Sequence, residues 1–351
     1  MINARILGVL VVVSAIVLVA VIYSQQNDRY APEKVGNFFA DLIKNVNQVA
    51  KVQITTADGV VSLIKQESEW AVKQKDNYPA SSSKVRALIL GLAELRRLEP
   101  KTKNPGLYSK LGLADLTEQG SRSMLIQLQD QNEADIAALV VGNHKRVGTA
   151  GNRSQYYVRL PFEPQAWLTE GQIPLDRTPG SWIDNQVMAI EPHEIQSVTV
   201  IQPDDEQLRI YRENKTDENY KLLTLDEGEE VESAYSINNI ARTLKSLTAD
   251  DVMPMDTIKF AEKPVQARID TFDGLRINVS IYKQDDKHYA HLSATATSGG
   301  SETSTAHEKA GTLNDHWHKW TYMIPDYQVD AVTIKKVDLI KKQNRQSEPK
   351  S

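Results

Sequence analysis

Hydrophobic and polar residues alternate along much of the chain, which is the pattern of strands that are buried on one face. The first such segment, residues 52–55, is followed by an Asp-Gly hairpin signal at residues 58–59 and by a second strand at residues 61–64. A third segment lies at residues 70–72, before a break at residues 78–80. This order predicts an antiparallel sheet that begins near residue 50.

The spacing then changes to that of a helix. Apolar residues that recur at intervals of three and four on one helical face are Val85, Leu88, Ile89, Leu92 and Leu95. Residues 81–83 are serines, which are good N-cap residues for such a helix. Alternation resumes at residues 124–128, 136–141 and 156–160, so we expect further antiparallel strands after the helix.

The same order of elements returns in the second half of the chain. Its alternating segments lie at residues 197–201, 208–211, 220–223, 265–271, 275–282 and 288–293. Among them a helix repeats the spacing of the first helix, displaced by 152 residues, at Ile237, Ile240, Ala241, Leu244 and Leu247. We therefore predict an internal duplication in which each copy reads β-β-β-α-β-β-β. The second copy is expected to end with a helix over residues 306–320 and a strand at residues 332–334.

The N-terminal residues differ from the rest. From Ile6 to Tyr23 there are 18 consecutive uncharged and mostly apolar residues. As a helix they would span roughly 27 Å, close to the ~30 Å hydrocarbon core of a bilayer. The alternative is a cleaved signal peptide, but its apolar region is typically about 7–15 residues long and is followed by small residues. We expect a retained transmembrane anchor, with the short N-terminal tail in the cytoplasm and the large C-terminal part outside.

A second amphipathic pattern follows the apolar run. Its apolar face consists of Val35, Phe38, Phe39, Leu42, Ile43 and Val46. Such a helix would lie either on the membrane surface or on the core of the domain that follows. Because interfacial helices favour Lys and Arg on their polar face, and this one is not rich in them, packing on the core is favoured.

The fold class that these patterns predict is α+β. An N-terminal transmembrane helix is followed by two related antiparallel-sheet modules. We expect the tail and anchor at residues 1–28, the first module with its leading amphipathic helix at 29–190, the second module at 191–340, and a polar disordered tail at 341–351.

Composition narrows the classes of partner. The chain carries a net charge of −5 and contains no cysteine. Mild acidity argues against nucleic acid, which requires a concentrated basic face. The lack of cysteine excludes both a disulfide framework and thiolate zinc sites.

No catalytic residues, cofactor or metal are predicted from the motifs. The sequence has neither a P-loop nor a nucleophile elbow. Five of the seven histidines fall between His288 and His318, and the sharpest metal candidate is the pair His316 and His318. On a helix end these two side chains would point apart, and His288 and His291 would face opposite sides of a strand. We expect surface or packed histidines.

Two tryptophans are the best candidates for a contact surface. Trp167 and Trp182 flank segments rich in Pro and Gly, at residues 161–164 and 174–180, which are typical of exposed loops. A carbohydrate or peptide would stack on such rings. The alternative is that aromatic residues at sheet positions belong to the core.

A series of short motifs also resembles a known family. The motifs lie at residues 36–39, 49–54, 78–80, 111–113, 141–142, 156–159, 166–168 and 181–184, together with Trp70. In this order and spacing they resemble the bacterial membrane-anchored proteins grouped as domain of unknown function 4340 (DUF4340). The resemblance implies a single-pass, envelope-facing protein that is often encoded beside ABC transporter components of the gliding-motility or auxiliary-transport type. It implies no catalytic residues.

The expected function follows from anchor and resemblance together. We expect a non-enzymatic accessory subunit of an ABC-type transport or gliding-motility-like complex, on the periplasmic side of a bacterial inner membrane. Its partners would be a permease, an ATPase and, through Ile6–Tyr23, the lipid bilayer. An anchored binding module for an envelope polysaccharide or peptide is the alternative, and a metal-dependent enzyme comes third.

Overall fold

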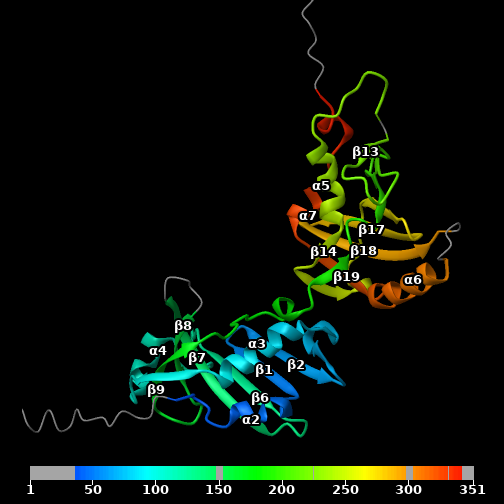
Figure 1. Ribbon diagram of the computed structural model, residues 1–351. Coiled ribbons are helices and arrows are strands. Elements are labelled where there is room, and N and C mark those ends of the chain that lie inside the picture. The colour runs from blue at the N-terminus through cyan, green and yellow to red at the C-terminus, as the bar shows by residue number, and fades with distance from the viewer. Residues whose placement is uncertain (1–35, 148–152, 224, 298–302, 331, 342–351) are drawn as a thin grey trace, which may run out of the picture.

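The computed structural model describes residues 36–147, 153–223, 225–297, 303–330 and 332–341. Within them the chain forms two large antiparallel sheets and one short two-stranded ladder (Figure 1). The apolar run from Ile6 to Tyr23 and the C-terminal tail from residue 342 lie outside the described residues.

The first sheet has nine strands in the order β4-β3-β2-β1-β6-β7-β8-β9-β5, and all neighbouring strands are antiparallel. They are β1 (Lys51–Thr56), β2 (Gly59–Gln66), β3 (Glu69–Val72), β4 (Tyr78–Pro79), β5 (Arg96–Pro100), β6 (Met124–Gln129), β7 (Asp135–Val147), β8 (Arg153–Arg159) and β9 (Ala166–Gly171). The alternation along β1 buries Val52 and Ile54 completely. Helix α3 (Ser82–Ala93) adds its apolar face, including Leu88, to the same core. We call this sheet and its helix the first module.

The second sheet has eight strands in the order β13-β12-β11-β16-β17-β18-β19-β15, again antiparallel throughout. They are β11 (Ile195–Ile201), β12 (Gln207–Tyr211), β13 (Lys221–Leu222), β15 (Asp251–Pro254), β16 (Val265–Thr271), β17 (Leu275–Gln284), β18 (Lys287–Ala296) and β19 (Trp320–Ile324). Helix α5 (Ala234–Leu244) covers its core, and α6 (Thr303–Trp317) is inserted between β18 and β19. This sheet with α5 and α6 is the second module.

Shorter elements complete the chain. The ladder joins β10 (Gln186–Ala189), in the connection between the sheets, to β14 (Ser246–Thr248) of the second module. The remaining helical turns are α2 (Leu42–Asn45), η1 (Val46–Gln48), η2 (Lys73–Lys75), η3 (Pro105–Leu107), α4 (Tyr108–Leu111), η4 (Pro179–Trp182), η5 (Met255–Thr257), α7 (Asp326–Asp330) and η6 (Lys336–Asp338).

The two sheets share one strand order. When β4 is set aside, each strand of the first sheet has a counterpart at the same place in the second, and α3 corresponds to α5 in chain order. Backbone hydrogen bonds agree as well. The Lys65 amide donates to the Ala50 carbonyl at 2.8 Å, and the Arg212 amide donates to the Gln196 carbonyl at 2.9 Å, each at the end of the second strand of its module. These bonds allow positions in the two modules to be compared residue by residue.

The predicted fold class needs correction. The sheets hold nine and eight strands, instead of the six predicted for each copy, so sheet dominates the described chain. The extra strands were missed because they are short or lack alternation; β5, for example, has hardly any buried residue. No helix within the described ranges is long and apolar enough to cross a membrane, and the predicted anchor at residues 6–23 falls outside those ranges.

The helix predicted from Val35 to Val46 was also wrong in length. Only α2 and η1 form, because Asn37 makes a strand-like bridge to Arg96 instead of starting a helix. Phe38 is nevertheless buried, at 3% exposure, and donates its amide to the Leu95 carbonyl. Phe38, Phe39, Leu42 and Val46 therefore pack on the core of the first module, whereas Ile43 is exposed. Val35 lies outside the described residues.

The end of the chain departs from prediction in two places. Helix α6 ends at Trp317, and Trp320 begins β19 where helix was expected. Residues 332–334 form no strand, since the Thr333 amide bonds to the Val329 carbonyl at the end of α7. The hydrophobic side chain of Val332 is fully buried, so the apolar signal reflects packing and not strand pairing.

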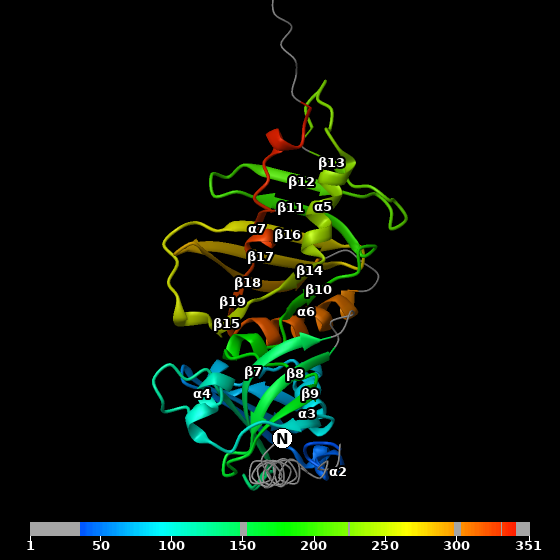
Figure 2. The same cartoon turned by 90° about the vertical axis from the view of Figure 1, so that its left-hand side faces the viewer.

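An aromatic joint connects the two modules. Tyr78, on edge strand β4, meets Trp320 edge to face with ring centroids 5.1 Å apart, and it lies 6.3 Å from Tyr322. Trp317 is fully buried at the end of α6 and donates its indole N–H to the Val187 carbonyl at 2.9 Å. Figure 2 shows the modules stacked end to end at this place, with α6 on the side of the second module that faces the first. One continuous hydrophobic core therefore extends through both modules.

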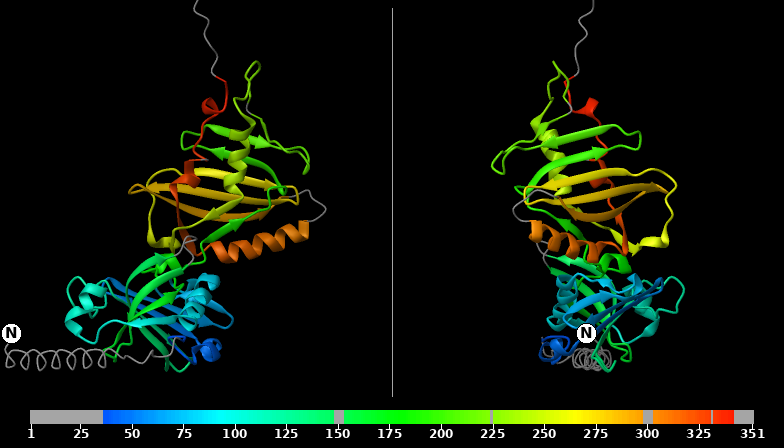
Figure 3. Two further views of the ribbon diagram at one scale, coloured as in Figure 1. Left: turned by 60° about the vertical axis from the view of Figure 1, so that its left-hand side comes forward. Right: turned by 90° about the vertical axis from the view of Figure 1, so that its right-hand side faces the viewer.

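Polar contacts close the edge of the joint. Lys75 bonds to Asp251 at 2.5 Å, so that η2 of the first module is tied to β15 of the second. Gly180 of η4 approaches the same carboxylate so closely that a Cβ would lie 2.8 Å from its Oδ1 atom. In the left view of Figure 3 the orange helix α6 lies along the lower edge of the second module, and one of its ends is next to the first module. We infer that the modules are fixed relative to each other.

We predict that alkaline pH weakens this joint. Burial raises the pKa of Tyr78 to about 12 and also raises the pKa of Tyr322, next to the Tyr78 hydroxyl. The pKa of a tyrosine in the unfolded chain is about 10, so the folded state prefers the neutral ring more strongly than the unfolded state does. The resulting stabilisation of the fold is complete below pH about 10 and is lost as the pH rises toward about 12. The free energy of unfolding, measured by urea titration, should fall by up to about 3 kcal/mol over this interval.

The double variant Tyr78→Phe/Tyr322→Phe should lose less stability over the same interval, because neither ring can ionise. Tyr327→Phe serves as the matched control, since this tyrosine is 67% exposed. Equal slopes for the wild type and the double variant would contradict the assignment.

Candidate functional site

The two tryptophans predicted as a contact surface are buried. Trp167 is 7% exposed and packs beneath the Arg97 guanidinium, 5.2 Å from the ring centroid. Trp182 is 0% exposed and donates its indole N–H to the Asp176 carbonyl at 3.1 Å. The Pro-rich flank of Trp167 does reach solvent, since Phe162 is 97% exposed, but the two indole rings are covered. The prediction of a surface at these positions is therefore corrected, and both rings belong to the core.

The histidines are placed separately. His288 contacts Asp326 at 2.9 Å and His291 contacts Thr321 at 2.8 Å, from opposite faces of β18. At the end of α6, His316 lies against the Tyr78 ring and the Nδ1 atom of His318 lies 2.6 Å from the Asn314 carbonyl. Across the described ranges, no three His, Asp or Glu side chains lie close enough together to hold a metal ion.

One hollow lies in the second module, beneath α6. It has a volume of about 490 Å³ and is lined by apolar residues such as Ile277 and Leu313. Of its charged groups, Lys309 bonds to Asp273 at 2.7 Å and Asp273 also accepts from Thr271, while Glu194 and Glu308 line the same hollow. Its one cation is therefore already paired with a carboxylate.

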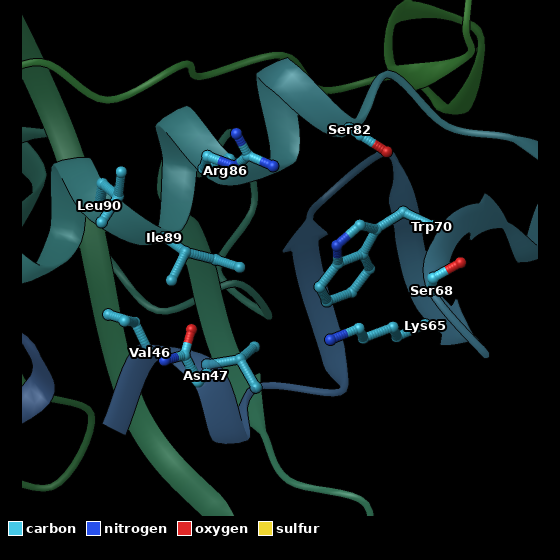
Figure 4. A pocket seen from close by; sticks show the side chains of 10 residues that line it. Val46, Asn47, Lys65, Ser68, Trp70, Ser82, Arg86, Ile89 and Leu90 are labelled. Carbon is cyan, nitrogen blue, oxygen red and sulfur yellow. The ribbon is translucent and has the colours of Figure 1, made fainter. Parts of the chain in front are cut away.

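A smaller cleft in the first module has the opposite character. It has a volume of about 280 Å³ and lies between η1, α3 and the β2–β3 hairpin. Figure 4 shows Trp70 projecting into it from β3, with Lys65 below the ring and Arg86 above it on α3. Ser68 and Ser82 place hydroxyl groups at its rim, and Val46 and Ile89 form its apolar wall.

Two features of local structure place these side chains together. Lys65 and Trp70 are cross-strand neighbours in the β2–β3 hairpin, so their side chains stand on the same face of the sheet. Arg86 follows the first buried residue of α3, Val85, and so comes to the border between the buried and solvent-facing sides of the helix. Helix α3, the turn η1 and the β2–β3 hairpin therefore all contribute side chains to this cleft.

The two cations of the cleft keep their charge available. Lys65 and Arg86 are both exposed, and within the described residues neither forms an ion pair with a carboxylate. Other lysines of the same module are paired, as Lys51 is with Glu133 at 2.9 Å. Positive charge beside the half-buried ring of Trp70 makes this cleft the best candidate for recognition of a ligand.

The cleft continues on both sides as a furrow. Lys65 and Asn47 also line an adjoining hollow of about 310 Å³, and Ser68 and Trp70 also line another of about 410 Å³. Each flanking hollow shares lining residues with the central one and therefore adjoins it. We call the whole feature the Trp70 furrow. Its length suits an extended ligand better than a compact one.

The equivalent position in the second module is closed. Arg212 and Tyr220 occupy the places of Lys65 and Trp70, by continuation of the β12–β13 register, and are only 7% and 9% exposed. The Arg212 guanidinium stacks 4.5 Å from the Tyr220 centroid and donates to the carbonyls of Pro192, Ile195 and Asp217 at 2.5 to 3.0 Å.

The helix takes part in this closure as well. Asn238, the counterpart of Arg86, accepts the Tyr220 amide at 3.0 Å. The second module thus shows that this fold can seal the position with its own side chains. In the first module the same position stays open. Among the described contacts, the side chain of Lys65 makes no bond to a backbone carbonyl of the neighbouring turn η1.

We predict that the two positions differ sharply in their effect on stability. Arg212→Ala would remove the donor to the carbonyls of Pro192 and Asp217, while the Ile195 carbonyl would keep its bond from the Tyr220 hydroxyl. The loss of these bonds and of a buried side chain should lower the free energy of unfolding by about 2 kcal/mol. Lys65→Ala should leave it unchanged within error, because an exposed, unpaired side chain is removed. Urea unfolding followed by far-ultraviolet circular dichroism measures both. Similar losses for the two variants would contradict the distinction between a sealed and an open position.

The comparisons with known proteins give one match. A family model described as a domain of unknown function, DUF4340, matches residues 70–270. The match begins at Trp70 in the furrow, includes Tyr78 of the aromatic joint and ends in β16 of the second module. Neither the curated proteins nor the solved structures include a match. Since the matched residues make up more than half of the chain, the protein belongs to the DUF4340 family.

Proposed function

We propose that the protein is a non-catalytic accessory subunit of an ABC-type transport or gliding-motility-like complex in the bacterial cell envelope, with both modules on the extracytoplasmic side of the cell membrane. The observation that carries the proposal is the aromatic joint. It holds two sheet modules at a fixed separation, and this suits a subunit that positions partners relative to one another.

The joint also argues against an enzyme of the usual two-domain kind. Active sites are common in the space between domains. Here that space is filled by Tyr78, Trp317 and Trp320, which pack against the core of the second module. No open cleft with polar groups facing both modules is formed by these residues.

The carboxyl groups give the same indication. Catalytic acids usually have a raised pKa, which keeps a proton available near neutral pH. Of the described carboxyl groups, those whose pKa is shifted all have it lowered, by hydrogen bonds and charge from partners such as Lys44 beside Asp41 and Lys51 beside Glu133. Surface carboxyl groups with a lowered pKa are typical of ion pairs that stabilise structure.

The choice of complex rests on the family. DUF4340 proteins are expected to accompany ABC transporter components, so a permease and an ATPase are the proposed partners. The mild net charge of −5 fits a protein that acts beside other proteins and not on nucleic acid.

A second candidate function is a binding module for an envelope polysaccharide or peptide. The Trp70 furrow favours it, because unpaired cations beside an aromatic ring are a recognition surface and not a structural requirement of this fold. The two functions are compatible, since an accessory subunit can also hold a substrate.

We predict that a permease and an ATPase copurify with the full chain. A photoreactive phenylalanine analogue would replace Phe162, which is 97% exposed in the β8–β9 loop and whose replacement costs no packing. After crosslinking in intact cells and extraction in mild detergent, mass spectrometry should find both transporter components enriched over a strain without the analogue.

The same analogue at Tyr327, on the second module, is the matched control for position, since that residue is 67% exposed. Different adducts at the two positions would show that each module faces its own partner. If neither position captures a membrane protein above background, the accessory role is wrong.

A further inference from the structure

We propose that the Trp70 furrow binds an oligosaccharide that carries a carboxylate on its central ring. The sugar ring would stack on the face of Trp70, and the carboxylate would lie between Lys65 and Arg86. This inference does not depend on the proposed transporter partners, because it concerns the free surface of the first module alone.

The charge of the central hollow selects an anion. Lys65 and Arg86 enter it from opposite walls, the hairpin and the helix, and neither is neutralised by a described carboxylate. Hydrogen bonds between such cations and a carboxylate are roughly twice as strong as those between neutral groups. An anionic group between them would gain two such partners at once.

The other residues of the hollow select a sugar. The indole of Trp70 supplies an aromatic face, and its half-buried position against the core limits its motion. Ser68, Ser82 and Asn47 place two hydroxyls and an amide at the rim, and these groups can both donate to and accept from sugar hydroxyls. A volume of about 280 Å³ lies at the lower end of small-ligand sites, which fits a single ring at the centre.

The flanking hollows define the length and charge pattern of the ligand. They extend the furrow by about 310 and 410 Å³, so rings on both sides of the central one can be accommodated. Glu67 and Glu69 line one flank, and Asp130 lines the other. A uniform polyanion would be repelled at both ends. The preferred ligand therefore has neutral rings next to the acidic one.

A peptide fits the furrow less well. Extended peptides commonly add a strand to an exposed sheet edge. The edge strand here is β4, of only two residues, and Pro79 has no amide hydrogen to donate. The next residue, Ala80, is already bridged to Ile183. No free backbone ladder is therefore offered beside Trp70.

The duplicated fold supplies the internal comparison. In the second module, Arg212 and Tyr220 seal the equivalent position with bonds to three backbone carbonyls. The open state in the first module is thus a property of its residues and not of the fold. A half-buried aromatic ring beside two unpaired cations is a surface that a ligand can cover.

The test uses the full chain in detergent and isothermal titration calorimetry. The probe is a hyaluronan tetrasaccharide, in which uronate and N-acetylglucosamine rings alternate, and the neutral comparison is chitotetraose. We expect the hyaluronan fragment to bind at least about tenfold more tightly than chitotetraose. The affinity should fall as salt is raised from about 0.05 M to about 0.5 M, because the cations are exposed.

Three variants locate the binding. Lys65→Ala and Arg86→Ala should each weaken binding of the hyaluronan fragment about tenfold, and Trp70→Leu by a similar factor. Arg209→Ala is the matched control, since it removes an exposed cation from β12 of the second module, outside the furrow. Circular dichroism shows whether each variant is folded. If Trp70→Leu does not fold, the two cation variants are sufficient to test the proposal.

Equal binding of the two saccharides, or unchanged binding by the cation variants, would overturn the proposal. So would binding of an acidic pentapeptide in the absence of saccharide binding, since it would assign the furrow to another class of ligand. Loss of transporter partners in crosslinking, with saccharide binding intact, would leave this inference standing and remove only the accessory role.

Discussion

The packing of Tyr78 against Trp320 is the contact on which the arrangement of the molecule depends. Tyr78 belongs to β4, the strand that the first sheet has and the second lacks. The additional strand therefore carries the ring that reaches the other module. Because the surrounding rings are buried and edge-to-face, they resist both sliding and opening of the joint. This contact therefore fixes the position of surface features on one module relative to those on the other.

The two modules share one backbone fold but carry different side chains at the equivalent position. An arginine at the end of the second strand can be buried, since its fork of donors reaches several carbonyls at once, as Arg212 does. A lysine at the same place, Lys65, has one compact charge and stays in water. Three differing side chains separate a sealed core position from an open furrow: Lys65 in place of Arg212, Trp70 in place of Tyr220 and Arg86 in place of Asn238.

The sequence predicted the parts of this structure that follow from periodicity. The first hairpin, α3 and its counterpart α5 could be placed because their apolar residues alternate or recur at helical spacing. Strands such as β5 could not, since an exposed edge strand shows no pattern. The furrow was missed because Lys65 and Arg86 are separated in sequence and line one cleft only through packing. The Pro- and Gly-rich flanks of Trp167 and Trp182 predicted exposed rings, but both rings are buried.

The continuous core also has an evolutionary consequence. A protein tolerates mutations only while its total stability stays above the threshold for folding. Because the modules share one core, the stability contributed by the Arg212 bonds supports residues of the first module as well. The furrow can then change its side chains, and with them its ligand, at little risk to folding. One half of the duplication would act as a reserve of stability while the other diversifies among species.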